Sequence, residues 1–241
     1  MGIQYSFKRY EKKFLLTPEQ HKKILPVLKE RLKEEKYGVH TICNIYYDTE
    51  NYDLIRASVE RPVYKEKFRL RSYGVPGDDS IMFAEIKKKS EGVVYKRRVD
   101  GSPDQILNFV TGGVPLDGDE QIQREIQWFL RVNKPIPKVF IGYERVALLG
   151  TKEDGLRVTF DWNIRWRDER LDLRLGDDGE LIIPDEIIIM EVKTPSAIPL
   201  WLVKLLSENK IYPASFSKYG TCYQKHILPN VFMKGSFAYA E

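Results

Sequence analysis

Short segments in which charged and apolar residues alternate recur along this chain, and they constrain its fold more than any other feature. The clearest runs from Leu156 to Arg167, where apolar residues take every second position and polar or charged residues take the positions between. Successive side chains of a strand point to opposite faces, so this pattern predicts a strand with one apolar and one charged face. The same reasoning predicts further strands at Tyr5–Leu16, Thr41–Asp48, Val63–Tyr73, Ile81–Lys89, Val93–Asp100, Lys138–Leu148, Arg170–Leu175 and Glu186–Thr194.

Helical patterns are fewer. Thr17 precedes Pro18 and Gln20, which is the order of an N-cap residue, a first-turn proline and the residue that closes a capping box. Pro26 then predicts that this helix kinks or restarts. Further helices are predicted at Pro103–Phe109, Asp119–Asn133 and Ile198–Glu208, and near Ser217–His226.

The order of these elements predicts the fold class. Many strands with hairpin-length connections and a few segregated helices indicate an α+β fold, built on an antiparallel β-barrel or a strongly curved sheet, with the helices packed on the outside. The chain has no internal repeat, low-complexity segment or linker-like stretch. We therefore expect residues 1–241 to form a single domain.

The charged faces of the predicted strands carry mostly cations. Alternation places Lys65, Lys67, Arg69 and Arg71 on one face of Val63–Tyr73. For a single strand, the ordinary explanation is the solvated face of an antiparallel sheet. Taken together, however, the opposite faces are rich in aromatic residues, which suits an apolar side covered by helices and a charged side turned inward. Cations confined there repel by about 4 kcal/mol per pair at about 4 Å and an effective dielectric of about 20, so an anion is expected among them.

Composition and motifs exclude several classes of function. The formal net charge is only +4, which does not suggest a strongly basic nucleic-acid surface. No apolar stretch reaches the length of a signal peptide core or a membrane span, so we expect a cytoplasmic protein. Cys43 and Cys222 lack metal-ligand spacing, and His21, His40 and His226 are interpreted as non-catalytic. P-loop, kinase glycine-loop, nucleophile-elbow and Cys-x-x-Cys patterns are missing from the sequence.

An ordered set of motifs gives the chain a family resemblance. It resembles the catalytic domain of the vacuolar transporter chaperone (VTC) proteins, which belongs to the triphosphate tunnel metalloenzymes and is related to the CYTH phosphohydrolases. Each motif is short, but their order and spacing cover nearly the whole chain. The matching stretches are Tyr10–Phe14, Asn44–Asn51, Phe68–Gly74, Glu85–Lys87, Tyr95–Arg98, Tyr143–Arg145, Leu156–Asp161, Met190–Lys193 and Phe216–Tyr219.

The resemblance implies an antiparallel tunnel that holds triphosphate or polyphosphate, together with the residues of its site. Glu191 would hold a divalent metal, Mn²⁺ or Mg²⁺, with Glu11 as a second candidate ligand. The residues implied in catalysis are Lys13, Arg69, Arg71, Lys87, Arg157 and Glu191. The residues implied in phosphate binding are Lys13, Arg69, Arg71, Lys87, Lys96, Arg145, Arg157, Lys193, Ser217 and Lys218.

One departure from the hydrolases of this group favours a polymerase. They carry a Glu-x-Glu-x-Lys strand near the N-terminus, and this chain has Arg9 in place of the first glutamate, followed by Glu11 and Lys13. A cation there removes a metal ligand and adds phosphate affinity. The expected reaction transfers the γ-phosphoryl group of a nucleoside triphosphate, ATP foremost, to a growing polyphosphate chain.

Three other functions are compatible with some of these features. Two of them, a tunnel triphosphatase and a non-catalytic polyphosphate-binding module, stay open. Whether a membrane protein receives the product also stays open. A single-stranded nucleic-acid binder is disfavoured, because Leu156–Arg167 places its aromatic residues opposite its charges and a stacking platform needs both on one face.

Overall fold

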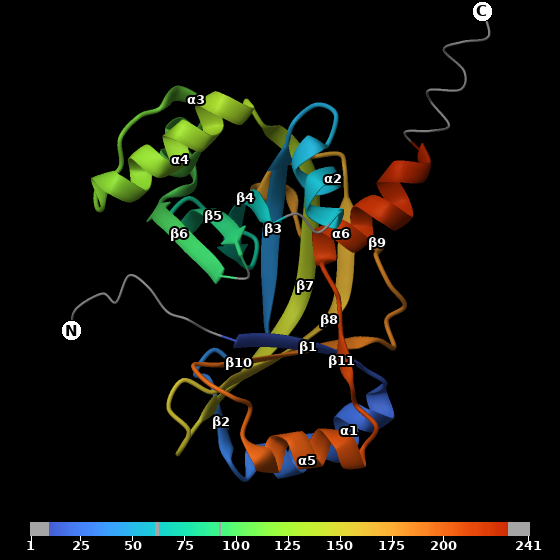
Figure 1. Ribbon diagram of the computed structural model, residues 1–241. Coiled ribbons are helices and arrows are strands. Elements are labelled where there is room, and N and C mark those ends of the chain that lie inside the picture. Colours follow the sequence, from blue (N-terminus) through green and yellow to red (C-terminus); the bar gives the residue numbers. More distant parts are fainter. Residues whose placement is uncertain (1–9, 61–62, 92, 231–241) are drawn as a thin grey trace, which may run out of the picture. The chain divides into compact units, whose positions relative to one another are not determined.

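The computed structural model describes residues 10–60, 63–91 and 93–230 (Figure 1). The chain divides into two compact units, and two long strands, β7 (Ile136–Gly150) and β8 (Arg157–Arg167), contribute residues to both. Unit 1 comprises residues up to Thr41, Tyr143–Ile164 and Ile183–Phe216. Unit 2 comprises Ile42–Gly142, Arg165–Ile182 and the residues from Ser217 onward.

Unit 1 is an antiparallel sheet with helices on its apolar face. Its strands follow the order β11 (Pro213–Ala214), β1 (Tyr10–Leu16), β10 (Ile188–Thr194), β8 and β7, and β2 (Leu32–Glu34) also pairs with β7. Helices α1 (Pro18–Lys29) and α5 (Leu200–Glu208) supply Ile24, Leu28, Leu202 and Leu206 to a core that also contains Phe14 and Phe160. The alternation of the strands puts this core on one face and the charged residues on the other.

Unit 2 repeats this arrangement with other elements. Its strands follow the order β7, β3 (His40–Asp48), β4 (Tyr64–Tyr73), β5 (Met82–Ser90) and β6 (Val93–Gly101), and β9 (Glu180–Leu181) pairs with β8. Helices α3 (Pro103–Gly112) and α4 (Glu120–Asn133) pack Ile106, Phe109, Ile126 and Phe129 against the apolar sides of these strands. The remaining elements are α2 (Asp53–Val59), the short helical turn η1 (Leu173–Leu175), α6 (Lys218–Cys222) and the π-helix η2 (Tyr223–Ile227).

The α+β class with a large antiparallel sheet is confirmed. Most predicted strands and helices match within two or three residues, and the capping box of Thr17 and Gln20 forms as expected. Among the described strands, the order in each unit is open, ending at β11 in unit 1 and at β6 in unit 2. The start of the first predicted strand, Tyr5 to Arg9, lies outside the described residues.

One local prediction was wrong, and another was wrong in part. The segment Arg170–Leu175 is not a strand, because Arg170 has a φ of 48° and the Asp172 carboxylate accepts a hydrogen bond from the backbone N–H of Arg174, which caps a helical turn. Of the kink or restart predicted at Pro26, the restart does not occur, because helix α1 continues to Lys29. Its buried residues Ile24 and Leu28 pack on the core on either side of the proline, and this packing offsets the lost hydrogen bond.

A third correction concerns β8, where the expected alternation does not persist. Asp161 binds Arg145, whereas Asn163 donates to Glu144, the preceding residue of β7. Neighbouring residues of a strand point to opposite faces, so Asp161 and Asn163 also face opposite ways although they are two apart. The alternation changes where Asn163 adopts a left-handed backbone conformation, with a φ of 49°.

Candidate functional site

The charged face of unit 1 is built in rows across three strands. The registers of β1, β10 and β8 align Lys13 with Glu191, and Glu191 with Thr159. The next row aligns Glu11 with Lys193, and Lys193 with Arg157. Period-two alternation therefore brings the predicted residues of β1, β10 and β8 together on one face.

Glu191 is the centre of this face. It is 7% exposed, its Oε1 lies 2.6 Å from Lys193 Nζ, and its Oε2 lies 3.8 Å from Lys13 Nζ. Burial acts to raise the pKa of Glu191, but Lys193 and Lys13 outweigh it and hold this pKa well below its usual range. The carboxylate is therefore ionised across the neutral range, as a metal or cation partner requires.

Two arginines of unit 1 are held by carboxylates through paired hydrogen bonds. Arg145 donates from Nε and Nη2 to Asp161 at 2.6 and 2.7 Å. Arg157 donates from Nε and Nη2 to Glu35 at 2.7 and 3.0 Å. Alternation placed Asp161 on the charged face, whereas Glu35 follows β2 in a loop and no sequence pattern marked it as a partner of Arg157.

Unit 2 has a second buried carboxylate surrounded by cations. Glu85 is 2% exposed, and its Oε2 accepts hydrogen bonds from Arg69 Nε and Nη2 at 2.9 and 2.8 Å. Arg71 Nη1 lies 3.7 Å from the same oxygen, and Lys96 Nζ lies 2.5 Å from Oε1. Burial acts to raise the pKa of Glu85, but Arg69, Arg71 and Lys96 together hold it well below its usual range. In the sequence, Glu85 begins one of the motifs that resemble the VTC domain, but no role was predicted for it.

A row of lysines lies next to this cluster. The registers of β4, β5 and β6 align Lys67 with Lys87, and Lys87 with Lys96. Lys67 Nζ donates to Ser217 Oγ at 3.1 Å, and Ser217 caps helix α6, which begins with the half-buried Lys218. The predicted phosphate ligands of unit 2 thus come from adjacent positions of β4, β5 and β6 and from the first turn of α6.

The expected site residues therefore divide between the two units. Lys13 and Glu191 lie in one row of the charged face of unit 1, and Glu11, Lys193 and Arg157 lie in the next row. Arg145, also of unit 1, binds Asp161 of β8. Arg69, Arg71, Lys87, Lys96, Ser217 and Lys218 belong to unit 2. Arg9, which distinguishes this chain from the hydrolases, lies outside the described residues.

Comparison with known families agrees with the motifs. The family model of the VTC domain matches residues 8–227, which span both units and every predicted site residue. The chain belongs to the VTC domain family. Comparison with curated protein sequences finds no match.

Solved structures share the fold of this VTC domain. A protein from Bacillus halodurans, named as a proposed adenylate cyclase, has a TM-score of 0.57 and 12% identity, and the match covers 93% of this chain and 100% of that chain. A protein from Hippeastrum, named as a proposed adenylyl cyclase with a dominant triphosphatase activity, has a TM-score of 0.53 and 19% identity. That match covers 91% of this chain and 97% of the other. At these identities the likeness shows the fold alone.

The carboxylates of this VTC domain fit a metal only if a substrate completes the site. Within the described residues, no group of three or more His, Cys, Asp or Glu side chains is placed to hold a metal ion. Mg²⁺ usually takes one or two carboxylates together with substrate phosphate oxygens. Glu191 can supply one such ligand, and the contact of its Oε1 with Lys193 would be shared or exchanged when the ion binds.

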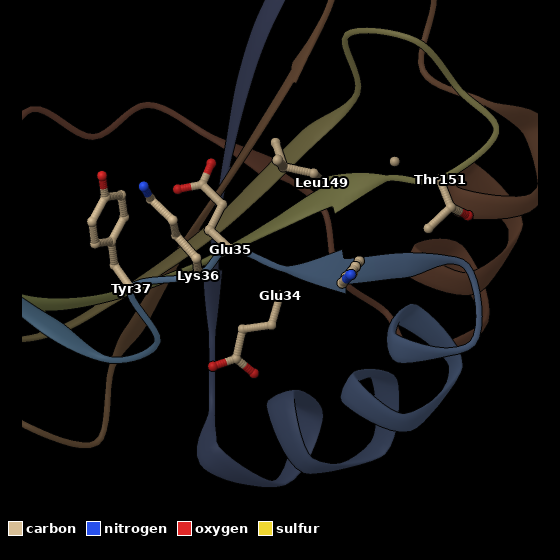
Figure 2. A pocket seen from close by; sticks show the side chains of 8 residues that line it. Glu34, Glu35, Lys36, Tyr37, Leu149 and Thr151 are labelled. Carbon is tan, nitrogen blue, oxygen red and sulfur yellow. The ribbon is translucent and has the colours of Figure 1, made fainter.

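A cavity in unit 1 lies beside the charged face rather than on it. It has a volume of about 740 Å³ and is lined by residues of β2, the loop after it, and the end of β7. Figure 2 shows Glu35, Lys36 and Tyr37 extending from this loop, with Leu149 and Thr151 on the β7 side. Glu35 connects the cavity to a predicted phosphate ligand through its hydrogen bonds with Arg157.

None of the helices in the described ranges is long and apolar enough to cross a membrane.

Proposed function

We propose that this VTC domain is a polyphosphate polymerase, which transfers the γ-phosphoryl group of a nucleoside triphosphate, ATP foremost, to a growing inorganic polyphosphate chain in the cytoplasm. The observation that carries the proposal is the charge of the two faces. Glu191 in unit 1 is buried between Lys193 of its own strand and Lys13 of the neighbouring strand, and Glu85 in unit 2 is buried among cations of the strands on either side. Faces of this kind suit a ligand that is itself a row of negative charges.

In this proposal the arginines and the lysines have different roles. Arg69, Arg71, Arg145 and Arg157 offer planar guanidinium groups, which recognise phosphate through paired hydrogen bonds. The lysines Lys13, Lys87, Lys96, Lys193 and Lys218 supply compact charges that neutralise phosphate oxygens, and the Ser217 hydroxyl adds a hydrogen bond. Phosphoryl transfer needs mostly such positioning and charge neutralisation.

Acid–base chemistry is a minor part of this reaction. The acceptor is an ionised phosphate, so no side chain must remove a proton from the nucleophile. The role of Glu191 is to hold Mn²⁺ or Mg²⁺, which when bound neutralises charge on the reacting phosphates. Lys13 and Lys193 keep the Glu191 carboxylate ionised and in place.

Product analysis tests the proposal. The full chain is incubated with ATP, Mn²⁺ or Mg²⁺ and a short polyphosphate primer, and the products are separated by gel electrophoresis and nucleotide chromatography. We expect ADP and chains much longer than triphosphate, with orthophosphate a minor product. Orthophosphate and ADP without any longer chains would replace the polymerase by a triphosphatase, the activity named for the Hippeastrum protein. Binding of polyphosphate without turnover would instead indicate a non-catalytic module.

A further inference from the structure

A tyrosine of helix α6 is joined to the predicted phosphate ligands of unit 2 by a series of contacts. Tyr219 is 2% exposed, and its hydroxyl donates to Asp48 Oδ2 at 2.9 Å. The same Asp48 carboxylate accepts backbone N–H groups of Thr49, Leu54 and Ile55 at 2.8 to 3.0 Å. Asp48 is thereby fixed at the end of β3, and it fixes the Tyr219 ring in turn.

The Tyr219 ring packs against Tyr46, which contacts the predicted phosphate ligand Arg69. It stacks on the Tyr46 ring, with centroids 4.8 Å apart and an interplanar angle of 25°. The Tyr46 hydroxyl accepts a hydrogen bond from Arg69 Nη1 at 2.9 Å, while Nε and Nη2 of Arg69 bind Glu85. Tyr46 and Glu85 therefore hold the guanidinium plane of Arg69 from separate sides.

The chain just before Tyr219 contacts the adjacent row of the same face. Ser217 Oγ accepts from Lys67 Nζ at 3.1 Å and from the backbone N–H of Gly220 at 3.2 Å. Lys67 and Arg69 are two residues apart on β4, so their side chains lie on one face. Anchoring Tyr219 thus restrains both Arg69, through Tyr46, and the Ser217 contact with Lys67.

We propose that Tyr219, anchored by Asp48, is a positioning residue that holds Arg69 and Ser217 in the geometry that binds phosphate. This inference rests on the proposed function, because it assigns Tyr219 a part in the same site. Tyr219 itself touches neither phosphate nor metal in this scheme. Its effect reaches the ligand through Tyr46 and through the first turn of α6.

The test removes one hydroxyl and measures affinity for tripolyphosphate by calorimetry, without nucleotide or metal. Tyr219→Phe keeps the ring but loses the hydrogen bond to Asp48, and we expect affinity to fall about fivefold, the factor of one ordinary hydrogen bond. Tyr223→Phe is the matched control. Tyr223 lies four residues further on, is 5% exposed, and its ring contacts Tyr52 rather than Tyr46. Its affinity should equal that of the parent.

Two further measurements separate positioning from a general loss of stability. The melting temperature of each variant is recorded, and its affinity is measured well below that temperature. If Tyr219 has a purely structural role, Tyr219→Phe lowers the melting temperature but leaves the affinity unchanged. Tyr46→Phe is then combined with Tyr219→Phe in a double-mutant cycle. If Tyr219 acts through Tyr46, the double variant binds more tightly than the sum of the two losses predicts. Additive losses would overturn this route.

Arg69→Ala distinguishes the failure of this inference from the failure of the proposed function. If Arg69→Ala binds tripolyphosphate as well as the parent does, the phosphate site itself is misassigned. If Arg69→Ala weakens binding while Tyr219→Phe leaves it unchanged, the site stands and the positioning role of Tyr219 is refuted.

Discussion

Glu85→Gln should destabilise the ligand-free protein and make its stability unusually responsive to phosphate anions. The substitution keeps the size of the side chain but removes the negative charge that Arg69, Arg71 and Lys96 surround. Glu85 is 2% exposed, so water cannot easily reach this position to screen the cations once the negative charge is removed. The three cations would then face one another without their shared counter-charge.

The size of the effect follows from the burial of the cluster. Removing one partner of a buried ion pair costs about 3–5 kcal/mol. The side chains of Arg69 and Lys96 are 21% and 42% exposed, so solvent screening places the expected loss near the lower end, about 3 kcal/mol. For a chain of this size, that loss lowers the melting temperature by about 6–12 °C.

Tripolyphosphate should reverse much of this loss. A ligand at about 100 times its dissociation constant stabilises a protein by about 2.7 kcal/mol. Because the variant lacks the internal carboxylate, its cations should bind the anion more tightly, and its melting temperature should approach that of the parent. Sodium chloride at the same ionic strength is the comparison salt, since it screens charges without bridging them.

An exposed glutamate provides the matched control for charge removal. Glu208 forms an i,i+4 pair with Lys204 at 3.8 Å on the surface of α5, and Glu208→Gln should change stability by less than about 0.5 kcal/mol. If Glu85→Gln is as stable as the parent, or if tripolyphosphate and chloride shift its melting temperature equally, Glu85 is not the counter-charge of an anion-binding cluster.

The same cluster predicts the sign of a pH effect. Arg69, Arg71 and Lys96 hold the pKa of folded Glu85 below the value of about 4.5 expected for the unfolded chain, against the opposing effect of burial. The stability contributed by ionised Glu85 is therefore fully present above about pH 4.5 and is lost as the pH falls toward the folded pKa. In Glu85→Gln this part of the acid destabilisation should disappear.

Three further predictions address single residues. Glu191→Gln should abolish metal-dependent turnover of ATP while circular dichroism shows an unchanged fold, and wild-type activity would refute the metal assignment. Glu35→Gln should release Arg157 and tighten tripolyphosphate binding several-fold in calorimetry. The control is Glu34→Gln, because Glu34 is the adjacent residue and pairs with the surface residue Lys29, and this change should leave binding unaltered. Weaker binding in Glu35→Gln would mean that Glu35 orients Arg157 for phosphate instead. Burial lowers the pKa of His21, so the free energy of unfolding should fall as the pH drops below about 6.5, and chemical denaturation of His21→Gln should lack this component.

The charged rows could be predicted from the sequence because their information is local. Alternation along β1 and β10 places Lys13 and Glu191 on charged faces, and the antiparallel register then brings them opposite each other. The capping box at Thr17 is equally local, since its hydrogen bonds join residues three apart. Strand alternation and helix capping can be predicted because each depends only on residues that are close together in the sequence.

The missed features depend on contacts between distant residues or on a single unusual dihedral angle. Glu35 and Arg157 are 122 positions apart, and nothing in either segment indicates their pairing. Helix α2 was not predicted because its first-turn N–H groups are capped by Asp48, at the end of the preceding strand, rather than by an adjacent N-cap side chain. The change of alternation at Asn163 coincides with one positive φ, which the regular alternating sequence does not indicate.

The arginines of both units suggest why carboxylates recur on faces that are otherwise cationic. A guanidinium group carries five N–H donors in one plane, and a carboxylate that accepts two of them along one edge fixes the orientation of that plane. Asp161 does this for Arg145, Glu35 for Arg157, and Glu85 holds Arg69 through a single oxygen. A carboxylate in this role lowers the repulsion among neighbouring cations in the ligand-free state and reduces the conformational freedom lost on binding. It also competes with phosphate for the same cations, and the tighter binding predicted for Glu85→Gln and Glu35→Gln follows where this competition is the larger effect. The number of cations on a face therefore determines how strongly it attracts phosphate, whereas these acidic partners determine how accurately the arginines meet it.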